Sequence, residues 1–228
     1  MSESRKLPPH LVLTAVLSGS LTIGLSLAYI VLCALALLFR YDCYAASPYN
    51  SSGAQYFWKT IYRTYILDID CEYSLVNENL TREYTVFVLA IIILCISALC
   101  LVTAITLVTV VVDDTSSRYL NLLVFFYIGS CTASLVVDLT AATHFGLDYA
   151  HLSSSLIESV PGSSSNYETE VIRQGAFLFM GIALKGYVAP LANLILVILL
   201  TVYVVRHHKA VKNNEHSIHK LGVLEAFE

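Results

Sequence analysis

Four long apolar stretches dominate the sequence and leave few choices for its fold. They cover residues 11–39, 84–112, 119–143 and 175–205. Each exceeds the roughly 20 residues that a helix needs to cross a bilayer. Because hydrocarbon offers no partner to a bare backbone N–H or C=O group, a spanning segment of this length must be helical. The sequence therefore predicts an all-α polytopic membrane protein, a bundle of four transmembrane helices.

The composition supports this fold class. Hydrophobic residues make up 57% of the chain and charged residues 13%, against about 45–50% and about 25% in soluble domains. The first apolar stretch follows Arg5 and Lys6, as in a signal peptide, but its run of 29 residues is about twice a signal's hydrophobic region. We therefore expect it to be retained as the first helix rather than cleaved.

The orientation follows from two signals. Two sequons, beginning at Asn50 and Asn79, both lie in residues 40–83, and N-glycosylation marks the extracellular or luminal side. The remaining segments are then the cytoplasmic N-terminus (1–10), turn (113–118) and tail (206–228), and a second outer loop (144–174). The inner segments hold seven Lys and Arg in 39 residues, against five in the 75 residues of the outer loops, in agreement with the positive-inside rule.

The six cysteines fall into two groups. Cys43 and Cys71 lie in the first outer loop, in an oxidising compartment, so we expect a disulfide between them. Closing this loop of about 28 residues would restrict the unfolded chain by roughly 3–4 kcal/mol. The alternative is two free or intermolecular thiols. The other four, Cys33, Cys95, Cys100 and Cys131, lie within the apolar stretches and are expected to pack as small apolar groups.

Two charges interrupt the apolar stretches, Asp138 in the third and Lys185 in the fourth. A charge in hydrocarbon costs at least a few kcal/mol. With a helical rise of about 1.5 Å per residue, the predicted depths of Asp138 and Lys185 in the bilayer differ by about 7 Å. The long lysine side chain can span this gap. We predict an intramembrane ion pair that holds the third helix to the fourth. A proton or ion relay, and an Asp138 shallow enough to meet water, are the alternatives.

The fourth stretch also carries Gly186, Pro190 and Asn193. Pro190 cannot donate to the carbonyl of Gly186, so we expect a bend there. In transporters a broken helix with polar groups marks a substrate site. Glycine, proline and a single asparagine are also common in packed membrane helices that bind no ligand.

The first outer loop is rich in aromatic residues, whose polar tips suit contact surfaces and membrane interfaces alike. They are Tyr41, Tyr44, Tyr49, Tyr56, Phe57, Trp58, Tyr62, Tyr65 and Tyr73. We predict that Tyr56, Phe57 and Trp58 contact a partner, with a small core of the loop itself as the alternative. The second outer loop is rich in serine and is expected to be a flexible connection.

Sequence signals for catalysis or metal binding are weak. His144, Asp148 and His151 would share one helical face and hold a metal if the third helix continued, but Gly146 interrupts them and no fourth ligand is evident. Ordinary polar loop residues are the favoured interpretation. No nucleotide-binding, serine-nucleophile or zinc-protease motif occurs, so we expect neither an enzyme nor a cofactor. The net charge of −4 does not indicate a nucleic-acid partner.

The layout of four passes with a disulfide-bearing first loop resembles that of claudins. Claudins, however, carry a Gly-Leu-Trp segment before two nearby cysteines, whereas Trp58 lies between cysteines 28 positions apart. The run Ala183-Leu184-Lys185-Gly186-Tyr187-Val188, followed by Asn193 and Leu194, is similar to the start of the last helix in the arthropod four-pass family that includes Pasiflora and Fire exit. That resemblance implies a structural role in septate junctions.

Two classes of function follow. The first is a non-enzymatic scaffold of cell junctions in the plasma membrane, which acts through the first outer loop on other junctional membrane proteins or on a second copy of the chain. The alternative is a small transporter, channel or auxiliary subunit that uses the polar face of the third and fourth helices.

Overall fold

The computed structural model describes residues 9–44, 53–75, 79–113, 117–158, 164–185 and 188–225. All regular structure in these ranges is helical. The helices are α1 (Pro9–Phe39), α2 (Ala54–Tyr65), α3 (Glu83–Val112), α4 (Ser117–Glu158), α5 (Ser164–Ala183) and α6 (Val188–Glu225). This confirms the all-α prediction.

Three of the helices are long and apolar enough to cross a membrane. They are α1, α3 and the part of α4 between Leu120 and Leu156. The apolar part of α6, Leu191–Arg206, is shorter. Large apolar side chains such as Leu17, Leu99 and Phe125 are exposed on these helices, which water would disfavour and lipid accepts. The chain is a helical membrane protein.

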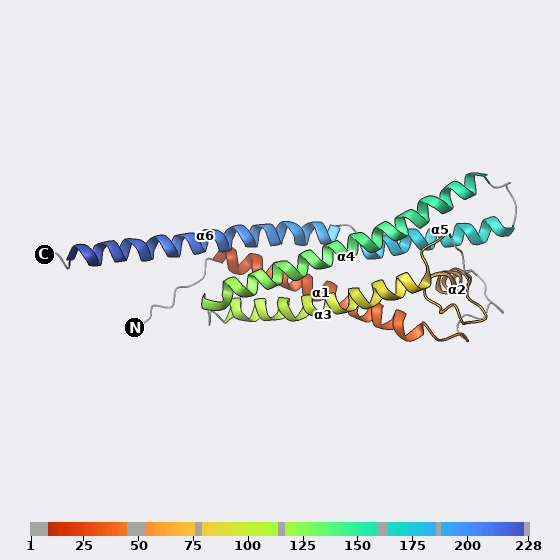
Figure 1. Cartoon of the computed structure of the whole chain (residues 1–228), viewed down its shortest axis with the longest axis horizontal. Helices are drawn as coiled ribbons and strands as arrows, with labels where there is room; N and C mark the ends of the chain where they lie inside the picture. Colours follow the sequence, from red (N-terminus) through yellow and green to blue (C-terminus); the bar gives the residue numbers. More distant parts are fainter. Residues whose placement is uncertain are drawn as a thin grey trace.

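The helices form an elongated bundle (Figure 1). Helix α1 packs against α3 and α6, and α4 packs against α3 and α5. Helices α5 and α6 follow one another along the bundle and together run back beside α4 (Figure 1). Helix α2 lies at the end of the bundle where α1 ends and α3 begins, and it contacts α3 and α5. The start of α1 and the end of α6 lie toward the opposite end.

Close packing of α1 on α3 depends on Gly19. A Cβ at this position would overlap the Val108 side chain of α3, so only glycine permits this approach. Ser20, Gly24 and Ala28 form another face of α1, which is exposed.

The fourth apolar stretch is two helices rather than one bent helix. Helix α5 ends at Ala183 and α6 begins at Val188, so the interruption comes before Pro190. Proline in a helix interior removes a hydrogen bond and clashes with the carbonyl four residues earlier. As the third residue of α6, Pro190 needs no backbone N–H, because the first four N–H groups of a helix have no intrahelical acceptor.

The second outer loop is largely helical, contrary to the flexible connection expected from its serines. Helix α4 continues through Gly146 to Glu158, and α5 begins at Ser164. Phe145 and Leu152 of α4 pack with Ile172 and Ala176 of α5 in one buried cluster. This apolar packing outweighs the cost of about 1 kcal/mol for a glycine within a helix.

Candidate functional site

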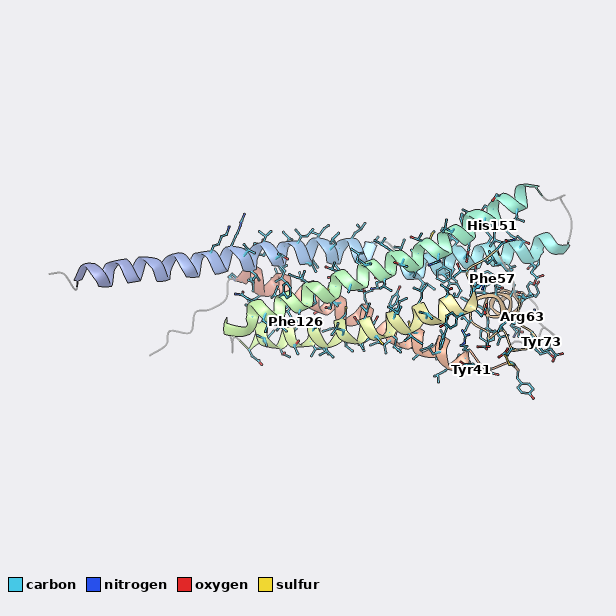
Figure 2. All side chains as sticks on the ribbon, in the orientation of Figure 1. Tyr41, Phe57, Arg63, Tyr73, Phe126 and His151 are labelled. Carbon is cyan, nitrogen blue, oxygen red and sulfur yellow. A yellow bond between two sulfur atoms is a disulfide. The ribbon has the colours of Figure 1, made fainter. Side chains whose placement is uncertain are left out.

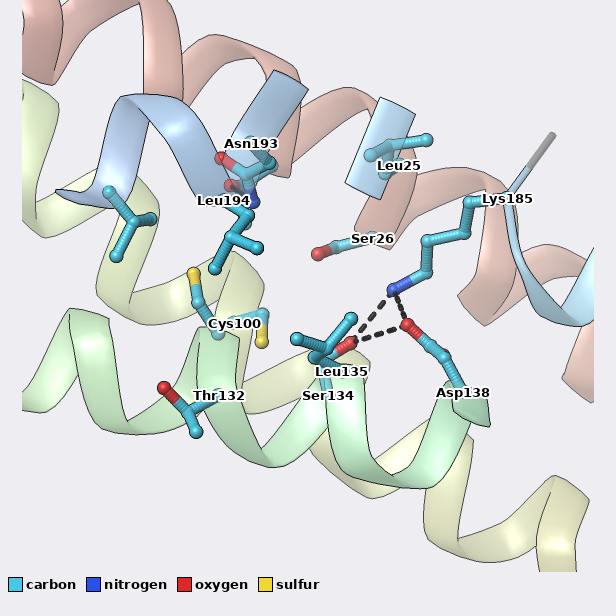
Figure 3. A pocket seen from close by; sticks show the side chains of 13 residues that line it. Leu25, Ser26, Cys100, Thr132, Ser134, Leu135, Asp138, Lys185, Asn193 and Leu194 are labelled. Atoms are coloured by element: carbon cyan, nitrogen blue, oxygen red, sulfur yellow. Dashed lines mark hydrogen bonds and ion pairs between the residues drawn. The ribbon is translucent and has the colours of Figure 1, made fainter. Parts of the chain in front are cut away.

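The two intramembrane charges meet in the structure. Lys185 Nζ lies 2.6 Å from Asp138 Oδ2 and donates to Ser134 Oγ at 2.8 Å, as Figure 3 shows. The Ser134 hydroxyl in turn donates to Asp138 Oδ2 at 3.3 Å. Because Asp138 is only 4% exposed, its charge needs this local compensation. The pair joins α4 to the link between α5 and α6.

The backbone at the end of α5 places Lys185. Its φ angle is +50°, a left-handed conformation that costs a non-glycine residue about 1–2 kcal/mol and commonly terminates a helix. Its N–H donates to the Ile182 carbonyl at 2.7 Å, and the Tyr29 hydroxyl donates to the same carbonyl. The Lys185 ammonium lies 5.0 Å from the centre of the Tyr29 ring, which adds a cation–π contact.

A second polar layer joins α1, α4 and α6. Asn193 Oδ1 accepts from Ser18 Oγ at 2.9 Å, and its Nδ2 donates to Thr22 Oγ1 at 3.2 Å. The Tyr127 hydroxyl lies 2.7 Å from Ser18 Oγ and 2.8 Å from Thr22 Oγ1. Sequence reasoning identified Asn193 but missed its two partners, Ser18 and Thr22, and Tyr127, which bonds to both of them. The i, i+4, i+8 spacing of Ser18, Thr22 and Ser26 on α1 is the signal that points to this face.

A cavity of about 120 Å³ lies between these two layers. It is bordered by α1, α3, α4, the link between α5 and α6, and α6 itself. The lining residues are Thr22, Leu25, Ser26, Cys100, Cys131, Thr132, Ser134, Leu135, Asp138, Lys185, Asn193, Leu194 and Val197. Of these, the sequence had predicted Asp138, Lys185 and Asn193 as site residues, and the structure brings all three to one cavity (Figure 3).

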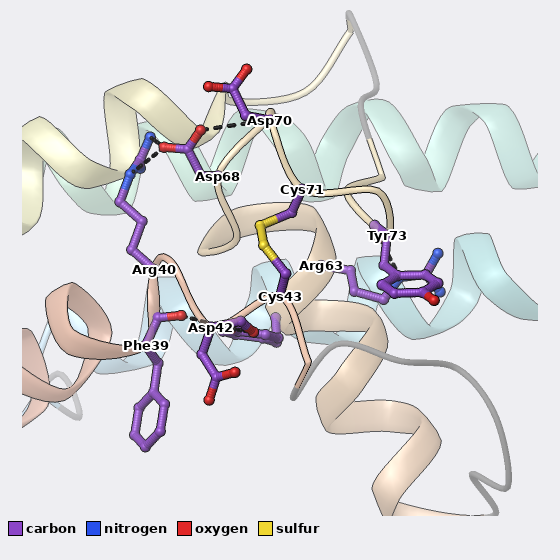
Figure 4. The surroundings of a disulfide bond; sticks show 10 residues. Phe39, Arg40, Asp42, Cys43, Arg63, Asp68, Asp70, Cys71 and Tyr73 are labelled. Carbon is purple, nitrogen blue, oxygen red and sulfur yellow. Dashed lines mark hydrogen bonds and ion pairs between the residues drawn. A yellow bond between two sulfur atoms is a disulfide. The ribbon is translucent and has the colours of Figure 1, made fainter.

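At the end of the bundle that the sequence predicts to lie outside the membrane, the chain after α1 and the chain after α2 are tied into one unit. We call this unit the outer cap (residues 40–44 and 53–75). Cys43 and Cys71 form a disulfide with a Cα–Cα distance of 5.5 Å, shown in Figure 4. Beside it, Arg40 makes an ion pair of 2.8 Å with Asp68. Arg40 Nη1 also donates to the Glu83 carbonyl at 3.2 Å, which fastens the cap to the start of α3.

Further hydrogen bonds hold α2 to the rest of the cap. The Tyr62 hydroxyl donates to the Phe39 carbonyl and lies 3.0 Å from the Asp42 carbonyl. Burial and, to a smaller degree, the Asp42 carboxylate raise the pKa of Tyr62. Arg63 Nε donates to the Tyr73 carbonyl at 2.6 Å. The cap is therefore a small folded unit rather than a loose loop.

The three aromatic residues predicted to contact a partner have different environments. Phe57 packs against the buried cluster around Ile61 (Figure 2), and the Tyr56 ring lies 5.6 Å from that of Tyr167 on α5. Trp58 is 56% exposed. Phe57 thus packs in a core, as the alternative interpretation expected, while Trp58 faces outward. Contact of these residues with a partner stays a prediction.

His144, Asp148 and His151 do lie on one continuous helix, but they do not converge. Asp148 is buried and accepts from the Thr81 backbone N–H at 2.9 Å, whereas His151 is exposed. Burial, with a smaller contribution from the Asp148 carboxylate, raises the pKa of the neighbouring Tyr65. Among the described residues no group of three or more His, Cys, Asp or Glu is arranged to hold a metal.

Several predicted site residues lie partly or wholly outside the described part of the chain. Asn50 and Gly186 are outside it, and for Pro190 only the backbone is described. Asn79 is described and exposed, two residues before the Thr81 that binds Asp148.

Comparison of the chain with protein-family models, curated proteins and solved structures found no match.

Proposed function

We propose that this chain is a non-enzymatic, four-pass plasma-membrane protein that serves as a structural component of cell–cell junctions, of the septate type implied by the family resemblance. Helices α5 and α6 together make the fourth pass, both termini are cytoplasmic, and the outer cap faces the outside. The protein contacts junctional membrane proteins through the outward surface of this cap.

The observation that carries the proposal is a covalently tied cap with exposed aromatic rings. The disulfide, the Arg40–Asp68 pair and the buried face of α2 fix the cap's backbone. On its surface Trp58 is 56% exposed and Tyr44 94% exposed. Aromatic side chains dominate the energetics of protein contacts, and a surface fixed in advance loses less conformational entropy when it binds.

The test is a double variant, Trp58→Ser with Tyr44→Ser, expressed in an epithelial monolayer. We expect the ratio of protein at cell contacts to protein on the free surface to fall to that of an unrelated plasma-membrane protein, while total surface delivery stays unchanged. Tyr84→Ser is the matched control, because Tyr84 is 65% exposed but lies in the first turn of α3, outside the cap. Unaltered enrichment of the double variant at contacts would refute the proposal.

Transport is the second candidate, favoured by one observation, the polar cavity beside an interrupted helix. In transporters, substrate sites are typically formed where a membrane helix is interrupted and polar groups face a cavity. If purified protein in liposomes moved an ion or solute, and Asp138→Asn or Asn193→Ala stopped that movement, transport would replace the scaffold function.

A further inference from the structure

The cavity between α1, α4 and α6 has hydrogen-bonding capacity that the protein does not use. Ser26 is only 5% exposed, and its hydroxyl has no hydrogen bond to any described residue; Figure 3 shows it directed into the cavity beside the Lys185 ammonium. An ammonium carries three donors, of which Asp138 and Ser134 accept two. The groups at this end of the cavity can therefore donate a hydrogen bond to a further polar group and accept one from it.

The walls become apolar away from this end. Leu194 and Val197 line the cavity there, and the polar groups of Thr22 and Asn193 are already bonded to one another. Along α4, the lining runs from Asp138 to Cys131, about 10 Å at about 1.5 Å per residue. A ligand that fits this gradient has a polar head and an apolar body.

The cavity reaches the side of the bundle. Thr132 of α4 and Leu194 of α6 both line it and are both exposed on the bundle surface. They belong to the apolar parts of their helices, so this mouth faces lipid. The cavity has a volume of about 120 Å³. This is much larger than the roughly 10–15 Å³ that one water molecule needs on the same measure. A head group and several carbons fit inside, with the rest of the ligand between α4 and α6.

The charge at the polar end selects a neutral head. Asp138 and Lys185 neutralise one another at 2.6 Å, and a charged ligand would leave one of them without its counter-charge in a medium where that costs several kcal/mol. A hydroxyl can accept a hydrogen bond from an ammonium and donate one to a carboxylate or serine oxygen. A ligand hydroxyl therefore makes both hydrogen bonds at this end without separating Asp138 from Lys185.

We propose that the cavity is a binding site for a hydroxyl-bearing neutral lipid, which enters from the bilayer between α4 and α6 and places its hydroxyl against Ser26, Asp138 and Lys185. Sterols and diacylglycerols share this chemistry. The site goes beyond the proposed junctional function and does not depend on it.

The test uses the purified full-length protein in phosphatidylcholine nanodiscs with a photoactivatable sterol and a photoactivatable diacylglycerol in parallel. We expect saturable labelling, competed by the unlabelled lipid, of peptides from α4 and α6. Labelling by one probe alone identifies the lipid. Non-saturable labelling, or labelling by neither probe, overturns the proposal.

Variants locate the site. Ser26→Leu fills the polar end and is expected to reduce labelling at least about tenfold, while Ser20→Leu, on the exposed face of α1, leaves it unchanged. Should Ser26→Leu fail to fold, Thr132→Trp blocks the mouth from an exposed position and must give the same loss. Equal labelling of Thr132→Trp and Ser20→Leu, or equal labelling by a sterol whose hydroxyl is methylated, also overturns the proposal.

Discussion

Lys185 combines three roles at the residue scale. Its backbone ends α5 in a left-handed conformation, its ammonium neutralises Asp138, and the same charge lies over the Tyr29 ring. A buried ion pair is weak evidence for net stability, because the desolvation of both charges offsets much of their attraction. Loss of one partner is different, because it leaves the other charge buried and uncompensated.

We therefore predict that Asp138→Asn or Lys185→Met alone destabilises the protein by about 3–5 kcal/mol, and that the double variant is less harmful than the two single effects added together. Thermal unfolding in detergent and delivery to the cell surface measure this in a double-mutant cycle. Lys209→Met is the control, because Lys209 is exposed on α6. Strictly additive losses would show that the two residues do not interact.

At the scale of elements, the contact between α2 and α5 fixes the outer cap on the bundle. Gly175 of α5 lies against Ile61 of α2, and a Cβ at Gly175 would stand 2.6 Å from Ile61 Cγ1. Ile61 is 1% exposed, so it has little room to move away. The cap thus depends on one small residue in α5 as well as on its disulfide.

Gly175→Ala is accordingly expected to lower stability by about 1–3 kcal/mol, the usual cost of overpacking a core. The same change in an Ile61→Ala background should be close to neutral, because the obstructing side chain is gone. Gly181→Ala, where a Cβ meets no atom within 4 Å, serves as the control. Chemical or thermal denaturation of the purified variants reports the differences. Equal losses from Gly175→Ala in both backgrounds would contradict this packing.

Sequence patterns predicted these elements to different degrees. Apolar runs long enough to span a bilayer located α1, α3 and most of α4, because composition alone decides where such helices form. Asp138 and Lys185 could be paired because few partners exist for a charge in hydrocarbon. The Cys43–Cys71 pairing followed from the placement of the thiols.

Features that depend on tertiary contact were not predictable in the same way. The break lies before Val188 rather than at Pro190. Its position depends on a hydrogen bond from the Tyr29 hydroxyl, far away in sequence, to the Ile182 carbonyl near the end of α5. The helical course of residues 144–158 depends on packing against α5. In the sequence, Ser18, Thr22 and Tyr127 look like ordinary packing residues of their helices. Only the hydrogen bonds of Ser18 and Thr22 to Asn193, and of Tyr127 to Ser18 and Thr22, distinguish them.

At the scale of the whole molecule, the bundle has two unlike ends. The cap, the end of α4 and the start of α5 lie at one end, while the start of α1 and the end of α6 lie toward the other (Figure 1). Asn79 is exposed and precedes the start of α3, at Glu83, by four residues. In a bilayer such a molecule has a definite outside and inside.

We predict that glycosidase treatment of protein from a eukaryotic host lowers its apparent mass, and that Asn50→Gln with Asn79→Gln abolishes this shift. A C-terminal tag should be protected from protease added to intact cells and cleaved after permeabilisation. Treatment that leaves the mass unaltered, together with a tag that is cleaved on intact cells, would reverse the proposed orientation.

We propose above all that the outer cap contacts another membrane protein where cells meet. The most direct measurement replaces Trp58 with a photo-crosslinking amino acid in cells grown to confluence. Leu122, 55% exposed on α4, provides a lipid-facing control position. We predict a protein adduct from position 58 whose yield rises as cells make contact and that is missing from position 122. If position 58 gives no more protein adduct than position 122 at equal surface expression, the cap is not a contact surface and the account fails.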